Sequence, residues 1–420
     1  MLTAIVLAVL VATSDEARTA IRCGALIDGK SDAPMAPCVV LVRGNRIEAV
    51  GRDLAVPAGC ELVDLSDHTV LPGLIDCHTH VLLQGDPTAA SYDEQLLKES
   101  VPYRTIRAVA AARRALGYGF TTIRDLETEG AGYADADLKR AIASGIVPGP
   151  RMFVVTRSLD VTGAYPLLGY SWQLELPHGV QVVDGPWEGR KAVREQVAFG
   201  ADWIKVYCDR KYTIATDGHV SSTPTFTLEE LKAIVDEAHR LGRRVAAHAI
   251  GRPGIVNALD AGVDSIEHGQ GLDDVTIPRL VEQGVYWCPT ILVGLYVAEP
   301  RAAEGGTIWR ELPAKHREAF AKALRAHVRI AFGTDAGGFP WSENPAQEFA
   351  HLVRYGMTPM QAIRSATVVA AELLQQSSDL GTIEPGKLAD LVATKTDPLT
   401  DIAALEHIDW VMKDGRVQAR

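Results

Sequence analysis

Two histidines at the end of an apolar run form the first candidate metal site in this sequence. The run begins at Leu71 and ends in His78 and His80. Because side chains alternate along a strand, these two histidines point to the same side and can bind one metal ion together. A pair of polar residues can also simply cap a strand, so the pair alone does not decide between the two interpretations.

Further residues with metal-binding side chains follow other β-type segments. They are Lys205, His248, His268 and Asp335. Each has an ordinary alternative, such as a helix N-cap for Asp335 or a satisfied core histidine for His248. All of them, however, occur where an expected strand ends, and parallel barrels build their active sites at the carboxyl ends of strands. We therefore expect these residues to meet His78 and His80 at one site.

The lysine suggests what chemistry the site performs. A charged amine is costly at an apolar strand end, so we expect Lys205 to be a neutral amine there. Such an amine can react with carbon dioxide to give a carbamate, an anionic ligand that bridges two cations. Imidazoles with carboxylate-type oxygens suit zinc, although manganese and cobalt also fit this ligand set. Metal-bound water has a pKa of about 7, which favours hydrolysis at a carbonyl or phosphoryl centre.

The elements that must position these residues are β-type segments alternating with helical ones. For example, Thr227 and Glu230 form a capping box that predicts a helix start, and Gly242 predicts its end. Eight such strands favour an α/β fold with a closed (β/α)8 TIM-like barrel, although periodicity alone also allows a doubly wound open sheet. The expected strands end in the segments 71–80, 121–125, 152–155, 203–206, 245–248, 263–268, 285–288 and 330–335.

The two ends of the chain have a different rhythm of short β-type runs and turns. Such runs occur at 21–26, 39–42 and 47–50, and again at 388–393 and 410–417. We expect both ends to close into one small β-sandwich domain. The expected limits are 15–70 and 381–420 for its two parts and 71–380 for the barrel inserted between them.

Composition limits the partners and the compartment. The 420 residues are 47% hydrophobic and carry a formal net charge of -11, which argues against nucleic-acid or anionic-membrane partners. The apolar run Leu2 to Thr13 is too short for a membrane span of about 20 residues. We interpret residues 1–14 as a signal-like segment of a periplasmic or extracellular protein. If this segment is instead an N-terminal strand, the protein is cytoplasmic. Arg104 to Arg114 predicts a solvated helix face.

Taken together, these segments resemble the metal-dependent amidohydrolase superfamily, in the subtype with two metals bridged by a carboxylated lysine. The sequence is most similar to the branch of Xaa-Pro and Xaa-Arg dipeptidases, imidazolonepropionase-like proteins and ochratoxin-hydrolysing amidases. The resemblance covers nearly the whole chain from Leu26. It is carried by LIDG at 26–29, by 71–80, by 202–206, by AAHAIG at 246–251, by SIEHG at 265–269, by GTD at 333–335 and by GTIEPGKLADLV at 381–392.

The resemblance implies two divalent metal ions and a role for each ligand. The more buried ion would be held by His78, His80 and Asp335, and the second by His248 and His268, with the carbamate of Lys205 between them. Asp335 would also take a proton from the bridging hydroxide and pass it to the leaving nitrogen. Because relatives in this branch commonly assemble, we expect a homo-oligomer, with an octamer as one form.

The substrate pocket departs from the branch at one position. Ile250 stands where relatives often have His or Tyr, so another residue must orient the scissile carbonyl, and we expect this to be Tyr207. Two long loops are expected to form pocket walls with an aromatic lining suited to an aryl or bulky apolar group: 208–224, and 160–177 with Tyr165, Tyr170 and Trp172. Arg210 and Lys211 either meet a substrate carboxylate or are solvated.

The sequence therefore predicts a hydrolase of amide bonds in N-acyl amino acids or dipeptide-like substrates. Ochratoxin-type amides and Xaa-Pro or Xaa-Arg dipeptides are the expected classes of this small-molecule substrate. The first alternative is a cyclic-amide hydrolase of the imidazolonepropionase type, which would share every metal ligand. More distant alternatives are a phosphotriester or lactone hydrolase and a barrel scaffold without turnover.

Overall fold

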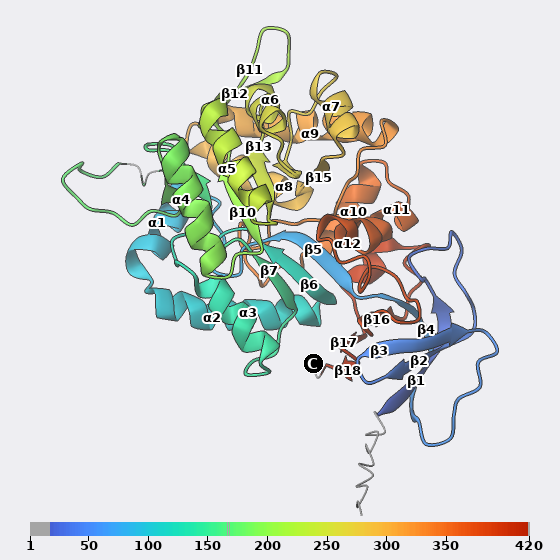
Figure 1. Ribbon diagram of the computed structural model, residues 1–420. Coiled ribbons are helices and arrows are strands. Elements are labelled where there is room, and N and C mark those ends of the chain that lie inside the picture. Colours follow the sequence, from blue (N-terminus) through green and yellow to red (C-terminus); the bar gives the residue numbers. More distant parts are fainter. Residues whose placement is uncertain (1–16, 166, 168, 419–420) are drawn as a thin grey trace, which may run out of the picture.

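Strands from both ends of the chain share one seven-stranded sheet. The computed structural model describes residues 17–165, 167 and 169–418 (Figure 1). The strand order is β18-β17-β16-β4-β1-β2-β3, in which only β1 and β4 are parallel neighbours. The strands are β1 (Arg18–Leu26), β2 (Cys38–Arg43), β3 (Arg46–Gly51), β4 (Glu61–Pro72), β16 (Leu391–Thr394), β17 (Trp410–Lys413) and β18 (Arg416–Val417). The ends meet as expected, whereas the sandwich arrangement and the domain limits stay predictions.

The middle of the chain forms two parallel sheets. One has the order β5-β6-β7 and the other the order β15-β14-β13-β10-β8-β9. Most of the expected strands are present, and the two short strands β8 and β9 are additional. The strands are β5 (Leu74–Thr79), β6 (Phe120–Asp125), β7 (Arg151–Val154), β8 (Leu159–Asp160), β9 (Gln181–Val182), β10 (Trp203–Tyr207), β13 (Arg244–Ala249), β14 (Ser265–His268) and β15 (Tyr286–Cys288).

The last strand expected from the sequence is extended but irregular. Ile330 makes an isolated parallel bridge with Trp287 of β15. The backbone N–H of Cys77 in β5 donates to the carbonyl of Phe332 at 2.9 Å. A regular strand cannot continue through Asp335, because its φ of 61° lies in the left-handed region. The segment therefore touches both parallel sheets without joining either as a strand.

Helices cover the parallel sheets (Figure 1). In α5, Thr227 and Glu230 form the expected capping box, and the helix ends just before Gly242. The helices are α1 (Ala89–Lys98), α2 (Val101–Gly117), α3 (Ala134–Ala143), α4 (Gly185–Ala198), α5 (Leu228–Arg240), α6 (Arg252–Ala261), α7 (Thr276–Gln283), α8 (Ile291–Ala303), α9 (Leu312–Arg325), α10 (Gln347–Arg354), α11 (Pro359–Ser365) and α12 (Val368–Leu373), with 3-10 turns η1 (Thr307–Arg310) and η2 (Ile402–Glu406).

Arg104 in α2 corrects one expectation from the sequence. It is buried, not part of a solvated helix face. Its guanidinium donates to the carbonyl oxygens of Leu82 at 3.2 Å, Thr128 at 3.1 Å and Glu129 at 2.7 Å. These carbonyls belong to turns that follow β5 and β6 and need donors once they are buried. The arginine is therefore part of the scaffold beneath the strand ends.

The segment after β10, expected as a loop, contains a hairpin of β11 (Asp209–Ile214) and β12 (Val220–Pro224).

The signal-like segment 1–14 lies outside the described residues, so export stays a prediction. In the described part of the chain, every helix is too short or too polar to cross a membrane. The cysteines are free thiols.

Arg151 joins β7 to the sheet of the chain ends, and its removal should destabilise the protein. Its guanidinium donates to Asp390 at 2.6 Å and to Asp414 at 2.5 Å, and Asp390 is buried. We expect Arg151→Ala to lower the free energy of unfolding by about 2 to 3 kcal/mol, because a buried carboxylate loses its partner. Urea unfolding measures this. Arg22→Ala, which breaks an exposed pair with Asp64, should cost under about 1 kcal/mol; equal losses would contradict the linking role.

Candidate active site

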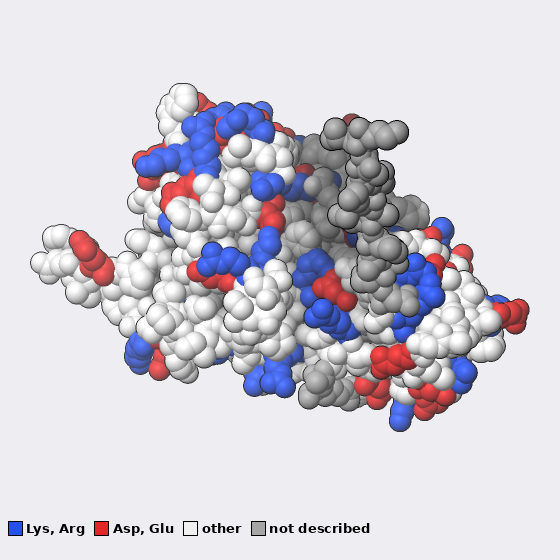
Figure 2. All heavy atoms as spheres, turned by 60° about the horizontal axis from the view of Figure 1, so that its bottom comes forward, with Lys and Arg blue, Asp and Glu red and all other residues white. Residues whose placement is uncertain are grey.

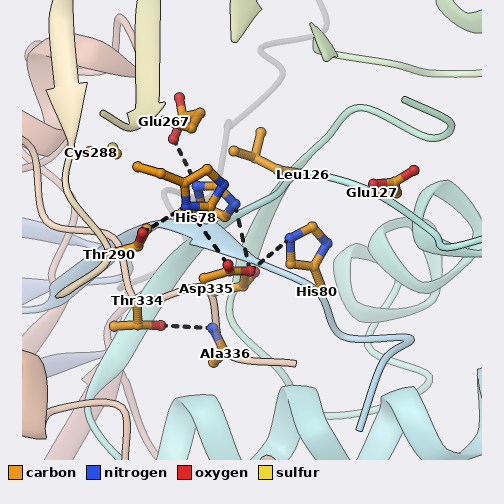
Figure 3. Close-up of polar contacts among 12 residues, drawn as sticks. His78, His80, Leu126, Glu127, Glu267, Cys288, Thr290, Thr334, Asp335 and Ala336 are labelled. Carbon is orange, nitrogen blue, oxygen red and sulfur yellow. Dashed lines mark hydrogen bonds and ion pairs between the residues drawn. The ribbon is translucent and has the colours of Figure 1, made fainter. Parts of the chain in front are cut away.

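His78, His80 and Asp335 form a buried cluster at the end of β5. His80 Nε2 lies 3.0 Å from Asp335 Oδ1, and His78 Nε2 lies 3.7 Å from the same oxygen (Figure 3). One ligand atom from each residue lies within 4.8 Å of the others, so the cluster can hold a metal ion. His78 Nε2 is buried without a hydrogen-bond partner. An unpaired imidazole nitrogen that faces a carboxylate is what a divalent cation would satisfy.

The backbone around the cluster holds Asp335 in its unusual conformation. The N–H of Asp335 donates to the carbonyl of His78 at 2.7 Å. The buried carboxylate of Asp76 accepts from the N–H of His78 at 3.0 Å and from the hydroxyl of Thr334 at 2.6 Å. Asp76 therefore ties the end of β5 to the segment that carries Asp335.

A buried ion pair fixes the orientation of His78. His78 Nδ1 donates to Glu267 of β14 at 2.8 Å, and Arg124 of β6 donates to the other oxygen of Glu267 at 2.8 Å. Burial raises the pKa of Glu267, but the charge of Arg124 and the bond from His78 outweigh it and hold that pKa well below its usual range. Glu267 is thus an anion that turns His78 Nε2 toward Asp335.

The other expected ligands lie beside this cluster. The imidazole ring of His268 is 4.9 Å from that of His78 and 4.6 Å from that of His248, between centroids. His268 Nδ1 is 2.8 Å from the hydroxyl of Thr290. Burial lowers the pKa of Lys205, as its place at an apolar strand end suggested. All of the expected ligands line one cavity of about 210 Å³: His78, His80, Lys205, His248, His268 and Asp335.

The histidines of the site differ in charge. Burial and the nearby charge of Lys205 lower the pKa of His78 to about 4. Burial acts on His80 in the same direction, but its bond to Asp335 and the charges of Asp335 and Glu129 raise its pKa to about 9. The pKa values of His248 and His268 fall well below the ordinary range, mainly through burial. His78, His248 and His268 are therefore neutral, which is the form of imidazole that binds divalent metals, whereas His80 is protonated at neutral pH beside Asp335.

The cavity wall contains some of the aromatic residues expected from the two long loops. Tyr165 and Tyr207 line the cavity, and Arg210 stacks on both rings, 4.4 and 4.1 Å from their centroids. Arg210 also lies 3.7 Å from the buried carboxylate of Asp160, whereas Lys211 is exposed. The prediction that Trp172 forms part of the pocket wall is wrong, because its side chain is 92% exposed.

Tyr207, the last residue of β10, and Tyr212 in β11 have different hydroxyl partners. The Tyr207 hydroxyl donates to Glu127 at 2.5 Å. The Tyr212 hydroxyl is 2.8 Å from His248 Nε2 and faces the same cavity. Tyr207 therefore lies at the site as expected, but its hydroxyl is engaged with a carboxylate.

Several residues in or beside the cavity were not identified from the sequence. Glu127 and Glu129 follow the carboxyl end of β6, so the strand-end rule applied to Asp125 would have found them. Arg301 and Trp309 come from α8 and η1, and no local pattern marks them. Asp86 pairs with Arg301 at 3.3 Å.

Comparison with known proteins identifies the family. The amidohydrolase family model matches residues 69–417. The chain belongs to the amidohydrolase family. Ochratoxinase of Aspergillus niger is 30% identical over 437 aligned residues, which cover 97% of this chain and 88% of that protein. A solved Xaa-Pro dipeptidase with bound methionine is 37% identical, has a TM-score of 0.86, and is matched over 96% of this chain and 100% of its own.

The chain is also similar to an imidazolonepropionase. Imidazolonepropionase of a Geobacillus species is 25% identical, with 90% of this chain and 89% of that protein covered. These matches confirm the superfamily branches expected from the sequence. Amidohydrolases generally use divalent metals, and the histidine and carboxylate cluster fits such ions. The chain is therefore a hydrolase of this family with residues suited to metal binding.

The contact between Thr290 and His268 predicts a mild loss of metal affinity. Thr290→Val keeps the shape of the side chain but removes the hydroxyl beside His268 Nδ1. We expect metal affinity to fall about 10-fold, because partners of metal-binding histidines set ring orientation and basicity. Competition with a chromogenic chelator measures this, and Thr290→Ser should keep the affinity. An unchanged affinity in Thr290→Val would show that His268 is not a metal ligand.

Proposed function

We propose that the protein is a binuclear metal-dependent hydrolase that cleaves amide bonds in N-acyl amino acids or dipeptide-like substrates. The main observation in support is that every expected ligand lines one cavity. Zinc is the proposed metal, and Lys205 is proposed to carry the bridging carbamate. Burial lowers the pKa of its amine, which supports reaction with carbon dioxide.

The ligands divide into two sets. His78, His80 and Asp335 would hold one ion, and His248 and His268 the other, with Lys205 shared. Bound divalent ions supply Lewis-acid activation of water and of the scissile carbonyl. Asp335 would accept the proton of that water on a carboxylate oxygen and donate it to the leaving nitrogen. Its closeness to His78 and His80 supports this role, because it keeps the carboxylate ionised at neutral pH.

The two parallel sheets are proposed to be parts of one closed eight-stranded barrel. The N–H of Asp202, just before β10, donates to the carbonyl of Val154 in β7 at 2.8 Å. On the other side, the irregular segment with Ile330 contacts β15 and β5. A closed barrel explains why side chains from β5, β10, β13 and β14 reach the same cavity.

Tyr212 is proposed to orient the scissile carbonyl. Its hydroxyl lies 2.8 Å from His248 Nε2 and donates to the carbonyl of Asp209 at 3.2 Å, whereas the hydroxyl of Tyr207 donates to the carboxylate of Glu127 at 2.5 Å. A phenol that can donate to the carbonyl oxygen stabilises negative charge there as the bond breaks. Tyr207 keeps its expected place in the substrate pocket as an aromatic wall.

The relatives support amide hydrolysis, but they suggest two kinds of substrate, a linear amide and a cyclic amide. The ochratoxinase and the Xaa-Pro dipeptidase favour the linear amide, and they are more similar to this chain than the imidazolonepropionase. A cyclic-amide hydrolase is therefore the second candidate. Phosphotriester or lactone hydrolysis and a scaffold without turnover are more distant.

Assembly and partners remain proposals. Figure 2 shows Lys and Arg among Asp and Glu and wide uncharged areas on one face. Such a mixture does not favour a polyanionic partner on this face. A homo-oligomer is proposed from the family resemblance, and light scattering after size-exclusion chromatography would measure its mass.

Metal removal and substitution of Asp335 test the proposed function. We expect a chelator to abolish hydrolysis in a screen of dipeptides and N-acyl amino acids, and zinc to restore it. Asp335→Asn should lower kcat about 100- to 10,000-fold, because both proton transfers lose their group. Lys205→Ala should lose bound metal as well as activity. Steady-state kinetics and metal analysis give these values; full turnover by either variant would reject the proposal.

A pair of phenylalanine variants separates the two tyrosines. Tyr212→Phe should lower kcat about 100-fold with a smaller change in KM, because its donor acts on the reacting carbonyl. Tyr207→Phe should change kcat less, because its hydroxyl is bound to Glu127. Kinetics on one linear amide substrate measure both. The reverse order would assign the carbonyl to Tyr207.

A further inference from the structure

Two carboxylates are buried on the turn between β6 and α3. Glu127 and Glu129 are 0% and 3% exposed. Glu129 has a φ of 50°, in the left-handed region that residues other than glycine rarely adopt. One oxygen of Glu127 is buried without a hydrogen-bond partner. Conformations of this kind persist only where the surrounding structure holds them, and they concentrate at binding sites.

The partners of these carboxylates are neutral. Tyr207 donates to Glu127 at 2.5 Å, and Tyr92 donates to Glu129 at 2.7 Å. Within the described residues, neither carboxylate has a Lys, Arg or His nitrogen within 4.0 Å. The nearby cation Arg104 uses its donors on backbone carbonyls. Apart from His80, whose pKa the charge of Glu129 helps to raise, the described residues place no cation against these two buried carboxylates, which is costly unless a ligand supplies one.

The pair lies next to the metal cluster. His80 is common to both groups: its ligand atoms lie within 4.8 Å of those of His78 and Asp335 and also of those of Glu127 and Glu129. In Figure 3, His80 stands between Asp335 and Glu127. His80 Nδ1 is buried without a partner, and Glu129 lines the cavity itself. A cation bound by these carboxylates would therefore lie on the other side of His80 from Asp335, close to the proposed site of amide cleavage.

The chemistry of a dipeptide matches this arrangement. Its α-ammonium nitrogen is about 2.5 Å from the carbonyl carbon of the scissile amide, given standard bond lengths and angles. An ammonium group is a compact cation with three donors, which suits carboxylate oxygens. Next to bound dications such a charge also needs anionic compensation. An N-acyl group carries no charge there and would leave both carboxylates unpaired.

We propose that Glu129, assisted by Glu127, binds the free α-ammonium group of the substrate, so that the protein hydrolyses unblocked dipeptides in preference to N-acyl amino acids. This substrate preference rests on the proposed amide hydrolysis at the same cavity. It selects one of the two substrate classes that the ligand set alone leaves equal.

The test compares a panel of dipeptides with their N-acetylated forms, using the full chain loaded with zinc. The wild type should favour the free dipeptide about 100-fold in kcat/KM, and Glu129→Gln should lower kcat/KM for it about 10- to 100-fold, the range expected for a lost charged hydrogen bond. The N-acetylated form should change less than about 2-fold, since it makes no such bond. Glu127→Gln provides a second variant should Glu129→Gln not fold.

Asp86→Asn is the matched control. Asp86 lines the same cavity and is also a carboxyl group, but it pairs with Arg301 at 3.3 Å. The variant should therefore keep the ratio between free and N-acetylated dipeptide. A ratio lowered as much as in Glu129→Gln would show a general charge effect and overturn the proposal.

Other outcomes separate this proposal from the proposed function. Equal or better hydrolysis of N-acetylated dipeptides by the wild type, or equal losses on both forms in Glu129→Gln, would overturn ammonium recognition while amide hydrolysis stands. Hydrolysis of neither form would instead reject the proposed function. Metal analysis adds one more result: loss of one equivalent of zinc in Glu129→Gln would mean that the carboxylates bind a metal ion, which also overturns the proposal.

Discussion

The contact of Asp335 with two buried histidines is the interaction on which the site depends. Taking these groups out of water is expensive, and the structure compensates with hydrogen bonds that leave His78 Nε2, which faces Asp335, without a partner. Glu267 accepts a hydrogen bond from His78 Nδ1, on the opposite side of the ring from Asp335, and Arg124 keeps Glu267 ionised. The parallel strands supply these supports from different parts of the chain. The fold therefore determines the charge state of the cluster as well as its position.

Much of this arrangement could be predicted from the sequence because one rule covers it. Polar residues at the carboxyl ends of parallel strands share one edge, so His248 and His268 could be assigned to the same site as His78 without any structure. The capping box at Thr227 depends only on residues close in the sequence, and the structure confirms it. Predictions of this kind succeed where a residue's place follows from strand period or from a helix end.

The predictions were wrong where contacts between distant segments determine whether a side chain is buried or exposed. The sequence pattern predicts Arg104 on the surface of an amphipathic helix, yet the side chain is buried and donates to carbonyls of distant turns. Trp172 reads as an apolar wall but points into solvent, and the corresponding wall comes from Tyr212 and Trp309. Nothing in the local pattern of α8 or η1 shows that either element faces the cavity. The pocket lining is thus less predictable than the ligand set.

Four residues around the cavity have an unusual backbone conformation. Asp335, His268, Thr290 and Glu129 all have φ between 50° and 69° although none is glycine. Each such residue costs on the order of 1 kcal/mol or more, which neighbouring hydrogen bonds must offset. Thr290 and His268 bond to one another, and the backbone of Asp335 bonds to His78. These hydrogen bonds hold side chains that line the cavity in place, so less ordering opposes binding of a ligand there.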